Sequence, residues 1–144
     1  KGLIQRVKKA SVTIDGELYS EIGQGILVFL GVEKGDEEPN AEKLADKICK
    51  LLIFEDENGK MNKSVQDING EILVVSQFTL AGDCKKGTRP SFDKAELPQR
   101  ANELYEYFNK LVADRSVPVK TGVFGAMMDI ALINDGPVTF MLEM

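Results

Sequence analysis

The sequence contains no histidine and only two cysteines among its 144 residues. The absence of histidine removes the usual general base, the Ser–His nucleophile pair and imidazole metal ligands. Neither Cys49 nor Cys84 has a CxxC partner, so we expect no zinc site and no disulfide scaffold. The acidic turn at residues 55–60 lacks the glutamate that closes a calcium-binding loop. We therefore expect no metal and no cofactor, and a cytosolic protein with Cys49 buried and Cys84 exposed.

The chain also lacks an excess of basic charge and a long apolar run. Its formal net charge is -5, so a nucleic-acid partner must be held by local basic groups and by shape. The longest apolar run, Ile26 to Leu30, is too short to cross a bilayer, and the first residues lack the apolar stretch of a signal peptide. We expect no membrane partner. The chain contains two basic clusters: Arg6, Lys8 and Lys9, and then Lys85, Lys86 and Arg89. From charge alone, both clusters are interpreted as solvated surface charge.

Length and hydrophobic patterning favour one α+β domain over residues 1–144. Apolar residues make up 43% and charged residues 28% of the chain, as in ordinary globular proteins. Strand-like segments at 3–9, 11–14, 18–22 and 26–32 predict an antiparallel meander, and helices are expected to begin near Pro39 and Pro98. Later strands are expected at 72–75, 127–133 and 138–142. This order predicts largely antiparallel sheets, sandwich- or barrel-like, with two main helices packed outside.

Two short segments place polar residues where apolar strands do not need them. At residues 76–80 a hydroxyl, an amide, an aromatic ring and a second hydroxyl follow a buried strand. At residues 134–139 a Gly–Pro pair separates two apolar runs, and proline cannot donate to a sheet ladder. The candidate site residues are therefore Ser76, Gln77, Phe78, Thr79, Gly136 and Pro137.

The first segment allows two kinds of chemistry and one structural explanation. Thr79 could be a nucleophile, but it needs a base and none lies nearby in the sequence. Backbone N–H groups at the strand end could form an oxyanion hole, which needs no titratable side chain. Alternatively, Ser76 and Thr79 cap the strand end and Gln77 pairs with backbone. Gly136-Pro137 could be a simple turn, and the pair alone does not predict a cis peptide.

Four segments together resemble the D-aminoacyl-tRNA deacylases over essentially the whole chain. Residues 3–12 are similar to the start of that family, and residues 87–92 are similar to its central loop. Residues 76–80 match its Ser-Gln-x-x-Thr signature and residues 134–139 its Asn-x-Gly-Pro-x-Thr signature. Four matches in the family's order and spacing are far more specific than any one of them.

The resemblance implies hydrolysis of the ester that joins a D-amino acid, or mischarged glycine, to the 3′-terminal adenosine of tRNA. It also implies a homodimer with active sites at the subunit interface, in which a cis Gly–Pro peptide reaches into the partner's pocket. By that analogy the catalytic pocket floor consists of Ser76, Gln77, Phe78 and Thr79. The substrate-binding residues are Gly136, Pro137, Arg6, Met128 and Phe124, with Arg6 holding the Gly–Pro peptide.

An aminoacyl ester is activated, so placement and a few hydrogen-bond donors can suffice. We expect backbone amides around Phe78 and Thr79 to polarise the carbonyl, with the ribose 2′-OH assisting water in preference to attack by Thr79. A main-chain wall at Gly136-Pro137 would collide with an L side chain and admit a D-residue or glycine. Two alternatives are a hydrolase of another activated ester and an RNA-binding or translation-associated dimeric module without hydrolase activity.

Overall fold

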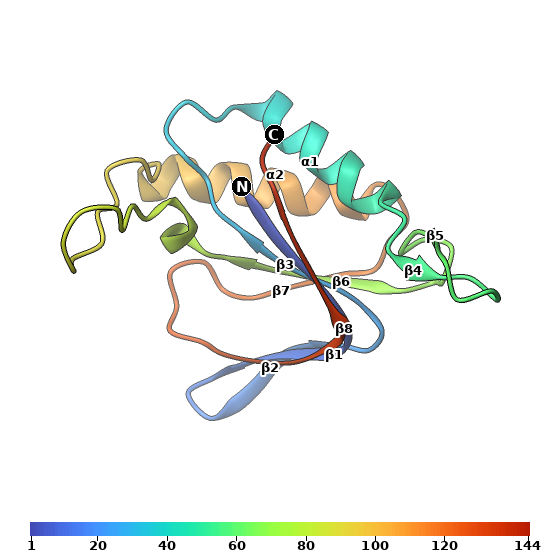
Figure 1. The fold of residues 1–144 in the computed structure, drawn as a ribbon. Coiled ribbons are helices and arrows are strands. Elements are labelled where there is room, and N and C mark those ends of the chain that lie inside the picture. Colours follow the sequence, from blue (N-terminus) through green and yellow to red (C-terminus); the bar gives the residue numbers. More distant parts are fainter.

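The computed structural model describes residues 1–144, and a six-stranded sheet forms its centre (Figure 1). The strand order is β2-β1-β3-β6-β7, and β8 pairs with the free side of β1. A separate hairpin of β4 and β5 contains the acidic turn. The strands are β1 (Gly2–Ile14), β2 (Glu17–Ile22), β3 (Gly25–Leu30), β4 (Phe54–Glu55), β5 (Met61–Lys63), β6 (Glu71–Ser76), β7 (Val119–Thr121) and β8 (Asp129–Leu142).

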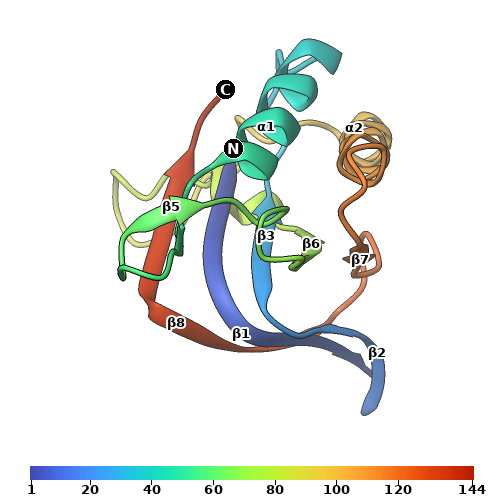
Figure 2. The same ribbon diagram turned by 90° about the vertical axis from the view of Figure 1, so that its right-hand side faces the viewer.

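The long strand β1 curls the sheet into an open barrel (Figure 2). Its first half pairs with β3 and its second half with β2, both antiparallel, while β8 follows it along both halves. The Ser20 hydroxyl of β2 donates to the Thr121 carbonyl of β7 at 2.8 Å, so the two ends of the strand order approach each other. The barrel-like character of the fold is therefore confirmed. The predicted antiparallel meander is wrong, because β2 and β3 both pair with β1 and not with each other.

The centre of the sheet is parallel, which the sequence analysis did not resolve. β6 pairs parallel to β3 and to β7, whereas every pairing of β1 is antiparallel. Parallel neighbours need a crossover connection, and the two helices provide one each: α1 (Glu38–Lys50) and α2 (Pro98–Ala113). The continuous apolar runs of β3 and β6 fit this arrangement, because parallel strands are buried on both faces.

The last two expected strands, 127–133 and 138–142, are one strand. β8 runs from Asp129 to Leu142 through the Gly–Pro pair, and its register on β1 shifts twice between Gln5 and Lys9. The prediction of two separate strands is therefore wrong. The Gly–Pro pair does lie in an irregular stretch of the single strand. The strand continues because the Asn134 side chain pairs with both the N–H and the carbonyl of Val138, which replaces ladder bonds at the irregularity.

Two apolar layers follow from the period-two alternation of the central strands. Ile26, Val28 and Ile72 point toward the helices and join a core of 17 buried residues, which includes the predicted apolar faces of α1 and α2. Leu27 and Leu73 point the other way, into a cluster of 7 buried residues inside the curl of the sheet. Both helices thus pack on the outside of the sheet, as predicted (Figure 2).

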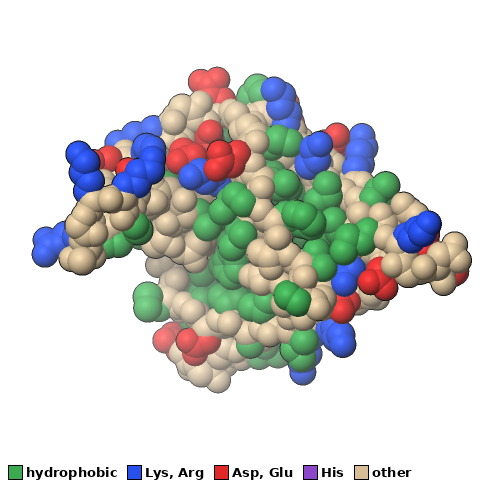
Figure 3. All heavy atoms as spheres, in the orientation of Figure 1, with side chains coloured by type: hydrophobic (Ala, Val, Ile, Leu, Met, Phe, Trp, Pro, Cys, Tyr) green, Lys and Arg blue, Asp and Glu red, His purple; other side chains and the backbone are tan.

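Several large apolar side chains remain exposed on the face that β8 crosses (Figure 3). β8 itself contributes Ile133, Phe140 and Met141, which are 45%, 42% and 47% exposed. Cys49 is buried and Cys84 exposed, as predicted. Neither helix has the length and apolar character that crossing a membrane requires.

Candidate active site

A cavity of about 620 Å³ lies where β6 ends, and five of the nine predicted site residues line it. This volume is within the range of small-ligand pockets, and most of the lining side chains are apolar, as such pockets usually are. The predicted residues in its wall are Ser76, Gln77, Phe78, Phe124 and Met128. Thr79 is exposed beside the cavity and does not line it.

The end of β6 shapes the first wall. The Gln77 N–H still pairs with the Leu30 carbonyl of β3 at 2.8 Å, and the chain then turns into a single 3-10 turn, η1 (Phe78–Ala81). That turn leaves the Phe78 side chain 56% exposed, with its ring edge-on to Phe92 at a centroid distance of 5.2 Å. An exposed aromatic pair therefore borders the cavity.

The backbone at this turn offers two unused donors. Neither the Phe78 N–H nor the Thr79 N–H donates a hydrogen bond to another group of the chain. The first N–H groups of a helical turn have no partner within it, so they are available to an external acceptor. Unpaired backbone N–H groups can stabilise a negative oxygen without any titratable side chain.

The Thr79 hydroxyl has no base beside it. Its partner is the Gln77 side-chain Nε2, which donates to Thr79 Oγ1. The electron pair of an amide nitrogen is delocalised into the carbonyl group and does not accept a proton, so Gln77 cannot activate Thr79 as a nucleophile. The structural explanation of the segment also fails at this point, because Gln77 pairs with a side chain and neither hydroxyl caps the strand end.

The segment before β8 forms the opposite wall. The Val123 N–H points to Met128 Sδ at 3.4 Å, and a Cβ on Gly122 would lie only 2.7 Å from that sulfur, so Met128 packs directly on backbone. The Phe124 ring lies 5.9 Å from the ring of Tyr105, whose hydroxyl donates to the Val74 carbonyl at 3.0 Å.

Burial raises the pKa of the Tyr105 phenol, so that hydroxyl stays protonated and keeps its donor role.

Wall residues that the sequence analysis missed come from the start of α2 and the loop before it, including Phe92, Glu96 and Ala101. Two of these residues could have been suspected from the sequence. Phe92 lies within the loop at 87–92 that resembles the family's central loop, and Ala101 lies on the apolar face of α2. No three His, Cys, Asp or Glu side chains gather closely enough to hold a metal ion.

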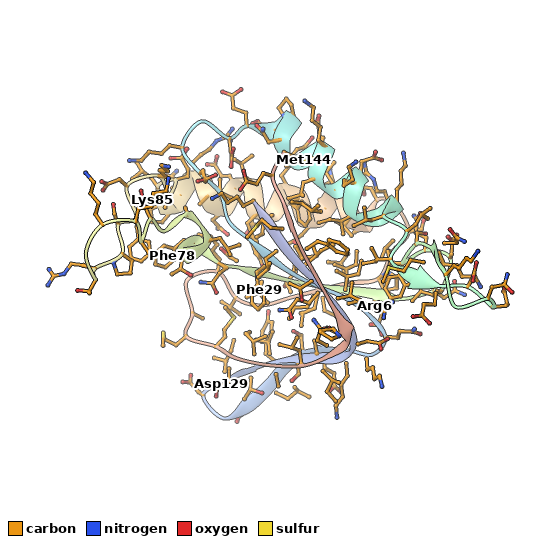
Figure 4. The ribbon with its side chains drawn as sticks, viewed as in Figure 1. Arg6, Phe29, Phe78, Lys85, Asp129 and Met144 are labelled. Carbon is orange, nitrogen blue, oxygen red and sulfur yellow. The ribbon has the colours of Figure 1, made fainter.

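Arg6, Gly136 and Pro137 lie elsewhere, at the irregularity of β8, and Figure 4 shows Arg6 beside that strand. The Gly136-Pro137 peptide is cis, and both residues are exposed. Gly136 has φ +144, and a Cβ there would lie 2.7 Å from Val138 Cγ2 and 2.9 Å from Val138 N. Only glycine fits this backbone position without displacement.

Arg6 reaches this peptide segment from β1. Its side chain is almost fully buried and donates from Nε to the Asp135 carbonyl at 2.9 Å and from Nη1 to the Ile53 carbonyl at 2.8 Å. The Asp135 carboxylate lies 3.7 Å from the same Nε. One guanidinium thus ties β8 to the chain that follows α1.

Asn134 fixes the same segment from within β8, a role that the sequence analysis did not predict. Its Oδ1 accepts the Val138 N–H at 2.7 Å, and its Nδ2 donates to Gln5 Oε1 at 3.0 Å, Thr139 Oγ1 at 3.0 Å and the Val138 carbonyl at 3.2 Å. The Asn and Thr of the second signature are therefore hydrogen-bonded to each other. None of Arg6, Gly136 and Pro137 lines the cavity, so one chain holds two separate groups of site residues.

Comparisons with known proteins agree with the two signatures. The family described as D-Tyr-tRNA(Tyr) deacylase matches residues 3–143. The D-aminoacyl-tRNA deacylase of Geotalea daltonii is 59% identical, over 99% of this chain and 95% of that protein, and the one of Thermodesulfovibrio yellowstonii is 59% identical over 98% and 97%. A solved structure described as c-Myc DNA Unwinding Element Binding Protein is similar with a TM-score of 0.94 and 44% identity, covering 99% of this chain and 97% of that one. The chain belongs to the D-Tyr-tRNA(Tyr) deacylase family, as its motifs predicted.

Proposed function

We propose that this protein hydrolyses the ester between a D-amino acid, or mischarged glycine, and the 3′-terminal adenosine of tRNA. This reaction frees the tRNA and keeps D-residues out of translation, and we place it in the cytoplasm, where charged tRNA is used. The observation that carries the proposal is the cavity of about 620 Å³ built on the Ser-Gln-x-x-Thr signature, in a chain of this family.

The free N–H groups of Phe78 and Thr79 are the donors for the ester carbonyl. Water adds to the carbonyl carbon, and the negative charge that develops on the carbonyl oxygen is stabilised by these donors. The tetrahedral intermediate then collapses, the bond to the ribose 3′-oxygen breaks, and that oxygen takes a proton. The neighbouring ribose 2′-OH assists the proton transfers, because no base of this chain contacts the Thr79 hydroxyl.

The second group of residues acts on the cavity of another subunit in our proposal. Gly136 and Pro137 are exposed and do not line the cavity of their own chain. The exposed apolar side chains of β8 flank them in sequence and suit burial against a second copy of the chain. A homodimer would therefore bring each Gly–Pro peptide to the partner's cavity.

Such a peptide accounts for chiral selection. Main chain has no rotamers with which to yield, and Asn134 and Arg6 hold this stretch on both sides. An L side chain directed at it collides, a D side chain points away, and glycine has no side chain to collide. The site then reads handedness and discriminates poorly among D-residues.

Release of D-Tyr, L-Tyr and glycine from charged tRNA by the purified protein tests the proposal. We expect turnover of D-Tyr-tRNA and Gly-tRNA and none of L-Tyr-tRNA. If neither D-Tyr nor glycine is released at near-stoichiometric enzyme, the proposal is wrong. Hydrolysis of a simple activated ester in that case would favour the other hydrolase function.

A second candidate is a nucleic-acid-binding module without hydrolase activity. It is favoured by the 44% identical solved structure, which is described as a protein that binds a DNA unwinding element. Tight binding of tRNA or DNA with no ester cleavage would support this candidate. Ester cleavage at catalytic enzyme concentrations would exclude it.

A further inference from the structure

We propose that the loop between Asp83 and Ser91 is the docking surface for the phosphodiester backbone of the tRNA acceptor end. The inference rests on the proposed function and identifies how the cavity would recruit its substrate. The loop carries three exposed cations, Lys85, Lys86 and Arg89. Figures 3 and 4 place Lys85 and neighbouring basic side chains at the end of the molecule where Phe78 lies.

Hydrogen bonds hold the base of the loop in a defined conformation. Asp83 and Ser91 exchange two backbone hydrogen bonds, at 2.7 and 2.9 Å, so the strands of the loop are paired where it leaves the fold. The Asp83 side chain accepts the Lys85 N–H at 2.9 Å, which fixes the first turn. Gly87 lies at the tip with φ +64 and open space around it. The cations are therefore presented on a closed hairpin-like loop.

This loop leaves the fold at the border of the cavity. Phe92 follows the loop directly, lines the cavity and contacts Phe78 edge-on at 5.2 Å. A Cβ on Gly82, at the other side of the loop base, would lie 3.1 Å from the Phe92 ring. RNA whose terminal adenosine enters the cavity would thus have its preceding phosphates beside the loop.

The positive charges of the loop and of Lys94 are not neutralised by ion pairs within the chain. None of Lys85, Lys86, Arg89 and Lys94 forms an ion pair within the chain, whereas Arg100 on α2 is paired with Glu38 and Glu103. Residues 83–94 contain four cationic side chains and two carboxylates, those of Asp83 and Asp93, so the segment keeps a net positive charge.

In a chain of net charge -5, this local cluster supplies the positive charge that phosphate requires. A second hollow of about 330 Å³ lies at the base of the loop, with Lys85 and Lys94 in its wall. Lysine and arginine on an exposed loop bind phosphates without reading bases, so the surface suits tRNAs of any sequence.

The test compares the triple variant Lys85→Ala, Lys86→Ala, Arg89→Ala with a charge-matched control, Lys43→Ala, Lys47→Ala, Lys60→Ala. The control lysines are exposed on α1 and on the β4–β5 hairpin and form no ion pair. Each protein is assayed with D-Tyr-tRNA and with D-tyrosyl-adenosine, which has the ester and no phosphate. Circular dichroism and urea unfolding confirm that both variants fold.

We expect the loop variant to lose roughly tenfold or more in kcat/KM on D-Tyr-tRNA at low salt, through KM, and to keep its rate on D-tyrosyl-adenosine. The slope of log kcat/KM against log salt should become shallower by about 2, because each lost contact to single-stranded phosphate removes about 0.7. The control should match the wild type on both substrates. Equal losses on both substrates would mean that the loop shapes the cavity, and an unchanged salt slope would mean that it binds no phosphate; either result overturns the inference.

Failure of the proposed function is distinguishable from failure of this inference. Absence of wild-type turnover on both esters would contradict the function and leave the surface testable by fluorescence anisotropy with uncharged tRNA. In that measurement the loop variant must bind more weakly than the control. Equal binding overturns the inference whatever the catalytic activity.

Discussion

The two signature segments of this chain differ in how they are held. The segment at 76–79 borders a cavity and leaves two backbone donors and an aromatic side chain free. The segment at 134–139 borders no cavity, and its backbone is fixed by Arg6 and by four hydrogen bonds of Asn134. Unused donors suit a place where substrate binds, whereas a fixed backbone suits a surface that must not yield.

The same difference motivates the homodimer that we propose. Gly136 and Pro137 are exposed and do not line the cavity of their own chain, which is lined by Phe78 and its neighbours. In the proposed homodimer, each site would combine the cavity of one chain with the Gly136-Pro137 segment of the other.

The largest effect should come from Gly136→Ala. Its Cβ would lie 2.7 Å from Val138 Cγ2 at φ +144, so the fixed segment must move. A displacement of about 1 Å at a catalytic wall can cost roughly a hundredfold, and we expect kcat/KM on D-Tyr-tRNA to fall by that order. The free energy of unfolding should fall by more than the roughly 1–2 kcal/mol that a left-handed backbone alone costs an L residue.

Gly59→Ala is the matched control for this substitution. Gly59 has φ +75 with nothing within 4 Å of an added Cβ, so it shares the backbone cost without the collision. Its kcat/KM should equal that of the wild type. Equal activity of the two variants would show that the fixed segment has no part in the reaction.

The second prediction tests whether the two segments meet between chains. Phe78→Ala and Pro137→Ala damage one segment each, so we expect each homodimer to be strongly impaired. In a mixed twofold dimer one site has both segments intact, and random mixing should restore about a quarter of wild-type activity. Mass spectrometry confirms that heterodimers formed, and no recovery in their presence would show that each site is complete within one chain.

Features that depend on local pattern were predictable from the sequence. The apolar runs at 26–30 and 72–75 are strands of the sheet, Pro39 and Pro98 lie within a residue of the beginnings of the helices, and the two signatures indicated the family. Strand direction was not predictable in this way, because the side chains of a fully buried strand alternate identically in parallel and antiparallel pairs.

Features that depend on distant side chains were also missed. The continuity of β8 through Gly136-Pro137 depends on the Asn134 amide, whose bonds to Gln5 and Val138 leave no trace in a hydrophobic pattern. The cavity joins the end of β6, the start of α2 and the segment before β8, which lie far apart in the sequence. Phe92 and Glu96 therefore entered the site only with the tertiary structure.

The third prediction concerns how firmly the segment of β8 is held. Arg6→Lys keeps the charge but replaces two donors on a planar guanidinium by one ammonium, which cannot reach both carbonyls in the same way. One buried carbonyl loses its partner, so the free energy of unfolding should fall by about 1–3 kcal/mol. Arg100→Lys alters an exposed ion pair and should cost less than about 1 kcal/mol, as measured in the same urea titrations.

The smallest effect should come from the segment to which we assign the chemistry. Thr79→Ala removes a hydroxyl whose partner is the Gln77 amide and leaves the Thr79 backbone N–H in place. If that N–H and the substrate's 2′-OH act, the variant should retain kcat within about tenfold of wild type, since losing general acid–base assistance usually costs about 10²–10⁴-fold. Single-turnover release of D-Tyr from D-Tyr-tRNA measures it. Complete loss of activity in a folded variant, together with an acyl-enzyme trapped on the wild type, would instead make the Thr79 hydroxyl, and not water, the nucleophile.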